Sequence, residues 1–197
     1  MKEIKVRLTF TDDVLGMMPA NKDIHEQYIA SKSPDAATIE EEVEAIGVDG
    51  VVEKTMTIFP RTEDGIPFIW DYQIRGMFKD AIGMLRKVTG SACEKVKAYK
   101  KAVDGLIFVK ERKIPFLILG EMGNCQRPLR AETMQGPRVA LANSETVPAG
   151  SQIEFTVVLL DDTLDKVIRE CLDYGVYRGI GQWRNSGKGR YEWKEIK

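Results

Sequence analysis

Hydrophobic and polar residues alternate from Glu3 to Phe10, and this alternation predicts a β-strand over Lys2–Phe10. The apolar side chains of Ile4, Val6 and Leu8 fall on one face, and polar side chains fall on the other. Similar short runs bounded by turn residues recur along the chain. Together they predict strands at Lys2–Phe10, Thr55–Pro60, Leu106–Val109, Pro115–Leu119, Ile153–Leu160 and Tyr191–Ile196.

A helical period is clearest between Tyr72 and Lys87. There the apolar residues recur every three or four positions, at Ile74, Met77, Phe78, Ala81, Ile82 and Leu85. Weaker helical patterns cover the lysine-rich segment Ala92–Val103 and a later segment that Asp161 is expected to cap and Gly175 to end. This order of elements favours an α+β fold, a ferredoxin-like (RRM-like) antiparallel sheet with helices on one face.

Residues 11–54 break the alternation directly after the first strand, and this stretch is acidic. Residues 1–54 hold 6 Lys and Arg against 12 Asp and Glu, whereas residues 55–197 hold 23 against 18. A helix that begins at Ser33 would place Ile39, Val43 and Ile46 on one stripe, with glutamates outside it. We therefore expect a single domain over residues 1–197, in which residues 11–54 form an acidic helical insertion or flap.

The composition excludes several classes of protein. The 197 residues are 43% hydrophobic and 30% charged, as in a folded domain, and no apolar run approaches the roughly 18 residues of a membrane span. The alternating N-terminus is unlike a secretion signal, so we expect a cytoplasmic protein. Three scattered cysteines and one histidine argue against a disulfide framework and a structural zinc site, and no cofactor is expected. The net charge of −1 means that any nucleic-acid site must be local.

One local cluster of positive charge lies on the predicted helix Tyr72–Lys87. At 100° per residue, Arg75, Lys79 and Arg86 fall within about 40° of one another, beside the apolar stripe. Such a row is often no more than a solvated helix edge. Three aligned cations without an intervening acid also fit the binding of an anion such as phosphate.

A second basic cluster lies in the glycine-rich tail, around Gly179, Gly181, Gly187 and Gly189. The tail matches neither the dinucleotide fingerprint nor the P-loop, because the third glycine and the spacing of the lysine differ. Glycines leave backbone N–H groups open to an anion. Cations and a stacking ring accompany them, as suits a single strand with splayed bases: Arg178, Trp183, Arg184, Lys188 and Arg190. The alternative is a turn that packs closely on the adjacent helix.

Three segments together resemble the repeat-associated mysterious protein (RAMP) superfamily, which supplies the RNA-binding backbone subunits of CRISPR effector complexes. Ile69–Arg86 is similar to the family's first helix, where Gln73-Ile-Arg-Gly76 stands at its signature of a small residue, a basic residue and a glycine. Ser144–Leu159 resembles the glutamate and strand entry of the family, and Gly179–Arg190 resembles its C-terminal glycine-rich loop. A stand-alone or mobile-element-encoded relative would share these segments.

The resemblance implies a ferredoxin-like core, binding of single-stranded RNA or DNA, and head-to-tail assembly along the strand. RNA is favoured over DNA. The residues that it points to are Arg75, Lys79 and Arg86 on the first helix and Arg184, Lys188 and Arg190 in the loop, all as phosphate contacts. Arg127, Arg130 and Arg138 are weaker additions from residues 120–140, a stretch that is expected to be irregular or a β-ribbon.

Catalysis has weaker support than binding. Some members of the family cleave RNA through a histidine, or through an aspartate and a metal in a loop after the first strand. The candidates here are His25 in the insertion and Asp12 and Asp13 after the first strand. We expect no catalytic residue and no bound metal. The alternatives are a metal-dependent endoribonuclease that uses Asp12 or Asp13, and a structural or inhibitory protein that docks on a nucleic-acid complex.

The charge asymmetry also suggests self-assembly. An acidic insertion and a basic remainder are complementary in sign, which favours a head-to-tail contact between copies over a symmetric one. The expected partners are therefore single-stranded RNA or DNA, further copies in an oligomer or filament, and other subunits of a nucleoprotein complex, with no membrane. If the insertion instead folds back over the basic groove, the protein would stay monomeric until a ligand displaces it.

Overall fold

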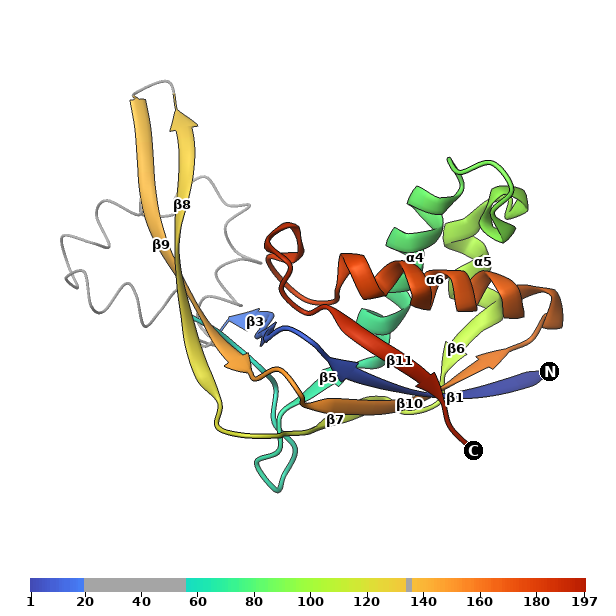
Figure 1. Ribbon diagram of the computed structural model, residues 1–197, viewed down its shortest axis with the longest axis horizontal. Helices are drawn as coiled ribbons and strands as arrows, with labels where there is room; N and C mark the ends of the chain where they lie inside the picture. Colours follow the sequence, from blue (N-terminus) through green and yellow to red (C-terminus); the bar gives the residue numbers. More distant parts are fainter. Residues whose placement is uncertain (20–55, 134–135) are drawn as a thin grey trace, which may run out of the picture. The chain divides into compact units, whose positions relative to one another are not determined.

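The computed structural model describes residues 1–19, 56–133 and 136–197 (Figure 1). These residues belong to two compact units. One unit comprises Met1–Val14, Pro60–Glu121 and Val147–Lys197, and the other comprises Leu15–Phe59 and Met122–Thr146. Most of the acidic insertion predicted for residues 11–54, including His25, lies outside the described residues.

The first unit is built on a six-stranded sheet with the order β11-β1-β10-β7-β5, to which β6 adds by pairing with β10. All its strand pairs are antiparallel. The central pair brings Val6 opposite Phe155 and Leu8 opposite Ile153, so the apolar face predicted from alternation is continuous across two strands. The strands are β1 (Lys2–Phe10), β5 (Phe68–Trp70), β6 (Ile107–Val109), β7 (Lys113–Leu117), β10 (Gln152–Leu159) and β11 (Tyr191–Glu195).

Three α-helices lie on the same side of this sheet in Figure 1. They are α4 (Asp71–Leu85), α5 (Tyr99–Leu106) and α6 (Asp165–Arg178), and three short 3-10 turns accompany them: η1 (Ala92–Lys95), η2 (Asp162–Leu164) and η3 (Arg184–Ser186). The α+β class with an antiparallel sheet is therefore confirmed. The continuous helix expected over Ala92–Val103 is wrong, because that segment divides into η1 and α5.

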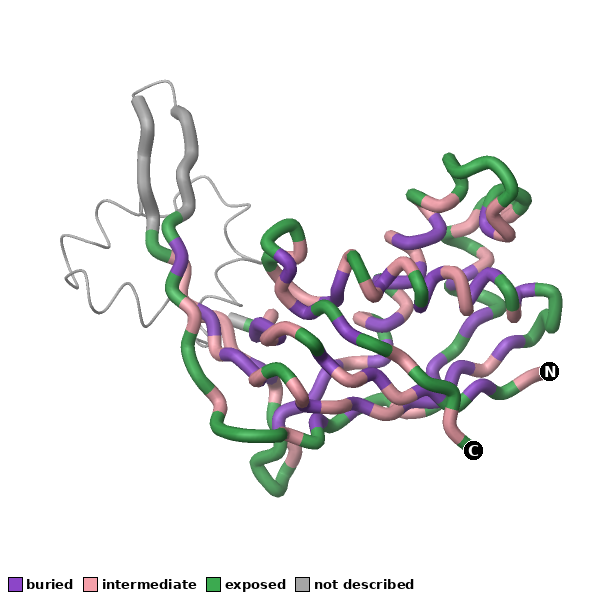
Figure 2. The backbone as a smooth tube through the Cα atoms, viewed as in Figure 1, coloured by how far each residue is buried: buried purple, intermediate pink, exposed green. Residues whose placement is uncertain are grey.

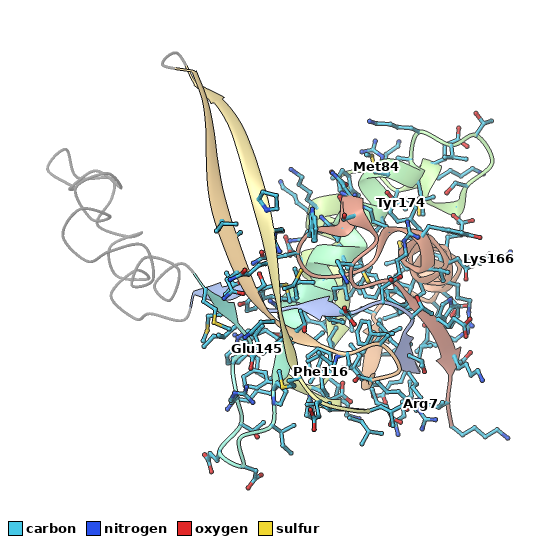
Figure 3. All side chains as sticks on the ribbon, turned by 60° about the vertical axis from the view of Figure 1, so that its left-hand side comes forward. Arg7, Met84, Phe116, Glu145, Lys166 and Tyr174 are labelled. Atoms are coloured by element: carbon cyan, nitrogen blue, oxygen red, sulfur yellow. The ribbon has the colours of Figure 1, made fainter. Side chains whose placement is uncertain are left out.

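The core fills the space between the helices and the apolar face of the sheet. Ile4, Val6 and Leu8 of β1 are fully buried, and so are Ile74 and Phe78 of α4. Figure 2 shows the burial alternating along the strands, and side chains crowd between the layers in Figure 3. The start of α4 is set by Gln73, whose side chain accepts the backbone N–H of Trp70 at 2.8 Å, as in a capping box.

Helix α6 does not end at Gly175, as the sequence suggested, but continues to Arg178. Gly175 is required for packing: a Cβ there would collide with the hydroxyl of Tyr191 and lie 2.5 Å from its ring carbon Cζ. Tyr191 is fully buried, and its hydroxyl donates to Met77 Sδ at 3.2 Å. The helix ends at Gly179 instead, which has φ +74°.

The second unit contains a long β-hairpin of β8 (Gly123–Thr133) and β9 (Gly136–Val147). The two strands pair antiparallel from Gly123 opposite Thr146 to Thr133 opposite Gly136. Short strands β2 (Val14–Leu15), β3 (Met18–Pro19) and β4 (Thr57–Ile58) complete a sheet of order β2-β9-β4-β3, in which β4 and β9 are parallel. Of the two expectations for residues 120–140, the β-ribbon describes the structure and irregular chain does not.

Candidate nucleic-acid interface

The basic row on α4 is present, and two of its three cations are paired with carboxylates. Arg75 donates to Asp71 Oδ2 at 3.1 Å, and Lys79 lies 2.5 Å from Asp104 of α5. Arg86 lies just past the helix end, exposed to solvent, with its guanidinium 5.2 Å from the ring centre of Tyr99. Pairing of this kind orients the side chains and lowers the net charge of the row.

Asp80 of α4 binds two arginines of the tail cluster and so holds them against the helix that carries the basic row. From α4 it accepts hydrogen bonds from Arg178 at the end of α6, at 3.2 Å, and from Arg184 in the glycine-rich loop, at 2.7 Å. Arg178 also donates to Asn185 at 2.6 Å. One carboxylate thus serves two guanidinium groups, so this junction keeps positive charge while its geometry is fixed.

The glycine-rich loop is tightly folded against its own chain. The N–H of Ile180 donates to Gly189 at 3.0 Å, and the N–H of Gly189 donates to the carbonyl of Asp13 at 2.8 Å. Gly189 has φ +73°, and a Cβ there would collide with the carbonyl of Ile180, so only glycine fits. Trp183 is 40% exposed and stands in the left-handed region at φ +53°. The loop therefore presents an aromatic ring from a rigid backbone.

The side chain of Asp13 forms hydrogen bonds with the glycine-rich loop and with the turn before β10. One of its carboxylate oxygens accepts from Lys188 Nζ at 2.9 Å, and the other accepts from the backbone of Ala149 at 3.2 Å. The hydrogen bond from Lys188 lowers the pKa of Asp13 below its ordinary value of 3.8, against the opposing effect of burial. Asp12 next to it is partly exposed, and no group of three or more metal-ligating side chains gathers within the described ranges.

The remaining candidates have different surroundings. Arg190 is exposed and donates to the backbone carbonyl of Tyr177 at 3.0 Å. Arg127 is only 7% exposed and donates to Ser144 Oγ at 3.3 Å, so in this structure its guanidinium stabilises the hairpin from inside instead of facing solvent. Arg130 of β8 pairs with Val139 of β9, and Arg138 of β9 pairs with Ala131 of β8.

The contacts predicted from the sequence left out Arg112 and the lysines of the lysine-rich segment. Arg112 binds Asp71 and lies over two aromatic rings, although it appears in the sequence only as part of a charged turn. Five lysines around η1 and α5 are exposed: Lys87, Lys95, Lys97, Lys100 and Lys101. Their density between residues 86 and 101, with Glu94 as the one acid there, was the available signal.

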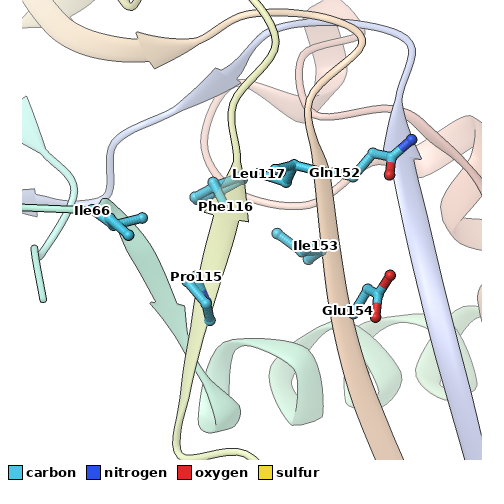
Figure 4. A pocket seen from close by; sticks show the side chains of 7 residues that line it. All are labelled: Ile66, Pro115, Phe116, Leu117, Gln152, Ile153 and Glu154. Atoms are coloured by element: carbon cyan, nitrogen blue, oxygen red, sulfur yellow. The ribbon is translucent and has the colours of Figure 1, made fainter. Parts of the chain in front are cut away.

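The face of the sheet away from the helices combines an ion cluster with an apolar cavity. Arg7 of β1 is bound there by Glu154 of β10, with 2.7 Å between Nε and Oε1 (Figure 3). Beside it lies a cavity of about 300 Å³, shown in Figure 4, whose lining is mostly apolar: Ile66, Pro115, Phe116, Leu117, Gln152, Ile153 and Glu154. The charged group among these is Glu154, whose carboxylate is shared by two cations, since it also lies 3.6 Å from Lys5 Nζ.

Comparison with known proteins identifies the fold. No protein-family model matches this chain, and no curated protein does so. A solved structure titled "Cryo-EM structure of the Type III-B Cmr-beta bound to cognate target RNA" contains a similar chain, with a TM-score of 0.57, 10% identity and 99% of this chain covered. This chain spans 59% of the length of that one. The fold of the present chain resembles that of a CRISPR effector-complex subunit. A chain of a "Type IV-B CRISPR Complex" also matches, with a TM-score of 0.48, 13% identity, and 99% and 90% of the two chains covered.

No helix among the described residues has the length and apolar character needed to cross a membrane.

Proposed function

We propose that this protein is a non-catalytic subunit that binds single-stranded nucleic acid, RNA rather than DNA, in a CRISPR-type complex or a relative of one. Membership of the RAMP superfamily and a ferredoxin-like core belong to the same proposal. The similar chain of known structure comes from a complex described as bound to cognate target RNA, which supports RNA as the ligand class. The acidic insertion and the basic remainder are the basis for proposing head-to-tail assembly along the strand.

The observation that carries the proposal is the junction at Asp80. It places Arg178 and Arg184 beside α4, with one carboxylate for two cations. The same ratio recurs at Asp71, which binds both Arg75 and Arg112. A surface with fixed guanidinium groups in excess of carboxylates suits a phosphate backbone, because each group is already oriented and keeps donors for the ligand.

Gly76 supports contact with a ligand at the same helix. It lies in the interior of α4 and is exposed, where glycine costs about 0.5–1 kcal/mol relative to alanine. A Cβ at this position would meet nothing within 4 Å in the described part of the chain, so the fold itself does not require glycine. Close approach of a strand to the helix backbone would explain the residue.

Exposed aromatic rings favour a single strand over a duplex. Trp183 is 40% exposed in the loop, and Tyr177 near the end of α6 is 78% exposed. Unpaired bases stack on such rings, whereas the bases of a duplex are already stacked on one another. The hydrogen bonds of Asp13 to Lys188 and Ala149 favour a structural role for this carboxylate in holding the glycine-rich loop.

Equilibrium binding to a labelled strand of 30–40 nucleotides tests the proposal. Arg184→Ala removes one cation from the Asp80 junction and should weaken binding to single-stranded RNA of any sequence. Arg169→Ala is the matched control: Arg169 also lies on the surface of this unit but is bound by two carboxylates of its own, Asp165 and Glu195. Equal affinities for the two variants, or equal affinity for duplex and single strand, would contradict the proposal.

Sizing with and without the strand tests assembly. Head-to-tail contacts predict several copies on one long strand, and deletion of residues 17–50 should then abolish assembly while binding persists. If the deletion instead raises affinity for the strand, the insertion covers the basic surface of its own copy. A single copy per long strand at high protein concentration would refute assembly.

A further inference from the structure

We propose that Trp70, Tyr72 and Arg112 form a binding site for one unstacked nucleobase, next to the phosphate-binding row of α4. The inference rests on the proposed function, since a single strand supplies the base. It concerns a separate set of residues from the Asp80 junction, so the two can fail independently.

The two rings are oriented for stacking. Trp70 and Tyr72 lie within 15° of parallel, with their ring centres 6.3 Å apart. Phe68 meets Trp70 edge to face at 82° and 4.8 Å, and Phe68 itself is only 2% exposed. The buried phenyl ring therefore holds the indole in place, and Tyr72, which is 50% exposed, offers its ring to solvent.

Arg112 adds a second planar group to the site. Its guanidinium carbon lies 5.2 Å from the ring centre of Trp70 and 5.9 Å from that of Tyr72. Asp71, which is buried, accepts one of its N–H groups and thereby orients it, while 65% of the Arg112 side chain stays exposed. Aromatic rings and guanidinium planes are the two groups on which proteins stack unpaired bases.

The site lies at the edge of the sheet. Strand β5 is the last strand of the sheet order, and its partner on the inner side is β7, with Trp70 opposite Lys113. Lys113 places its ammonium 5.6 Å from the ring centre of Phe68, which adds a second cation to the aromatic group. An edge position gives a ligand access that a central strand would not.

Asp71 connects this site to the basic row. Its two carboxylate oxygens bind different cations, Oδ1 to Arg112 and Oδ2 to Arg75. Arg75 begins the row of phosphate contacts that the sequence predicts. A strand whose phosphate reaches this row would therefore bring a neighbouring base within reach of the ring of Tyr72, and this favours a nucleotide over a free apolar ligand.

The test compares an ordinary single strand with an abasic strand of the same length and charge. Wild-type protein should bind the ordinary strand more tightly. Tyr72→Leu keeps an apolar side chain but removes the ring, so it should lose about 5- to 150-fold in affinity for the ordinary strand and nothing for the abasic strand. Tyr72→Phe keeps the ring and should bind both strands as the wild type does.

Arg112→Lys provides a second variant, which keeps the positive charge but replaces the planar guanidinium with an ammonium group. It should show the same selective loss for the strand with bases, with an unchanged salt dependence, because lysine keeps the positive charge. If Tyr72→Leu and Arg112→Lys both bind the two strands as the wild type does, the site is wrong while strand binding stands. If wild-type protein binds neither strand at low salt, the proposed function fails instead.

Discussion

Replacing Gly76 with alanine should raise stability and lower function at the same time. Gly76 is an exposed residue within α4, and a Cβ there meets nothing within 4 Å in the described residues. Alanine in a helix interior is more favourable than glycine by about 0.5–1 kcal/mol. For a chain of 197 residues this corresponds to an increase in Tm of about 1–4 °C.

The effect on binding should have the opposite sign. If a sugar-phosphate backbone lies against α4 at Gly76, an added methyl group occupies that contact, and overpacking of this size costs about 1–3 kcal/mol, or about 5- to 150-fold in affinity. Gly105→Ala is the control, since Gly105 is exposed in α5 with equally open surroundings. It should not alter binding.

Differential scanning calorimetry and strand binding on the three proteins give the answer. An increased Tm with unchanged affinity for Gly76→Ala would show that the strand does not contact this face of α4. A decreased Tm would refute the reasoning from open space, because the added methyl group would then be unfavourable in the free protein.

Two other predictions concern the fold that positions the loop. Gly175→Ala should destabilise the protein by about 1–3 kcal/mol or more, because the added methyl group collides with the buried Tyr191. Adding Tyr191→Phe to this variant should restore only part of the stability, since the ring carbon Cζ still lies 2.5 Å from the methyl group. Urea unfolding measures both variants, and an unchanged midpoint for Gly175→Ala would contradict the packing. Because the pKa of Asp13 is lower in the folded protein than its ordinary value of 3.8, the ionised carboxylate stabilises the folded state at pH values above 3.8. This stabilisation is lost as the pH falls from 3.8 through the lower pKa of the folded state. Acid unfolding of Asp13→Asn should lack this contribution, and an acid transition identical to that of the wild type would show that the Asp13–Lys188 pair is unimportant.

Local patterns predicted the elements well. The alternation of β1 and the period of α4 each follow from one face being buried, so the sequence carries the signal in adjacent residues. The predicted strand Lys2–Phe10 has the bounds observed, and the helix expected over Tyr72–Lys87 spans Asp71–Leu85. The end of α6 was wrong because Gly175 serves Tyr191, a contact with another element that periodicity does not reveal.

The site was predictable only in its residue types. Arg75, Lys79, Arg178 and Arg184 were correctly noted as cations in clusters, but their carboxylate partners come from elsewhere in the fold, as Asp80 does for Arg184 across 104 positions. Arg127 was expected at a phosphate contact, and its burial depends on the pairing of β8 with β9. The rings of Trp70 and Tyr72 were missed because the cation above them, Arg112, comes from a turn some 40 residues later.

The salt dependence of strand binding tests the central claim most directly. The logarithm of the binding constant for single-stranded RNA should fall linearly with the logarithm of salt concentration, by about 0.7 for each phosphate that the protein neutralises. Arg184→Ala should reduce this slope by about one such step, whereas Arg169→Ala should leave it unchanged. Absence of binding at low salt, or an equal slope in all three proteins, would contradict the account.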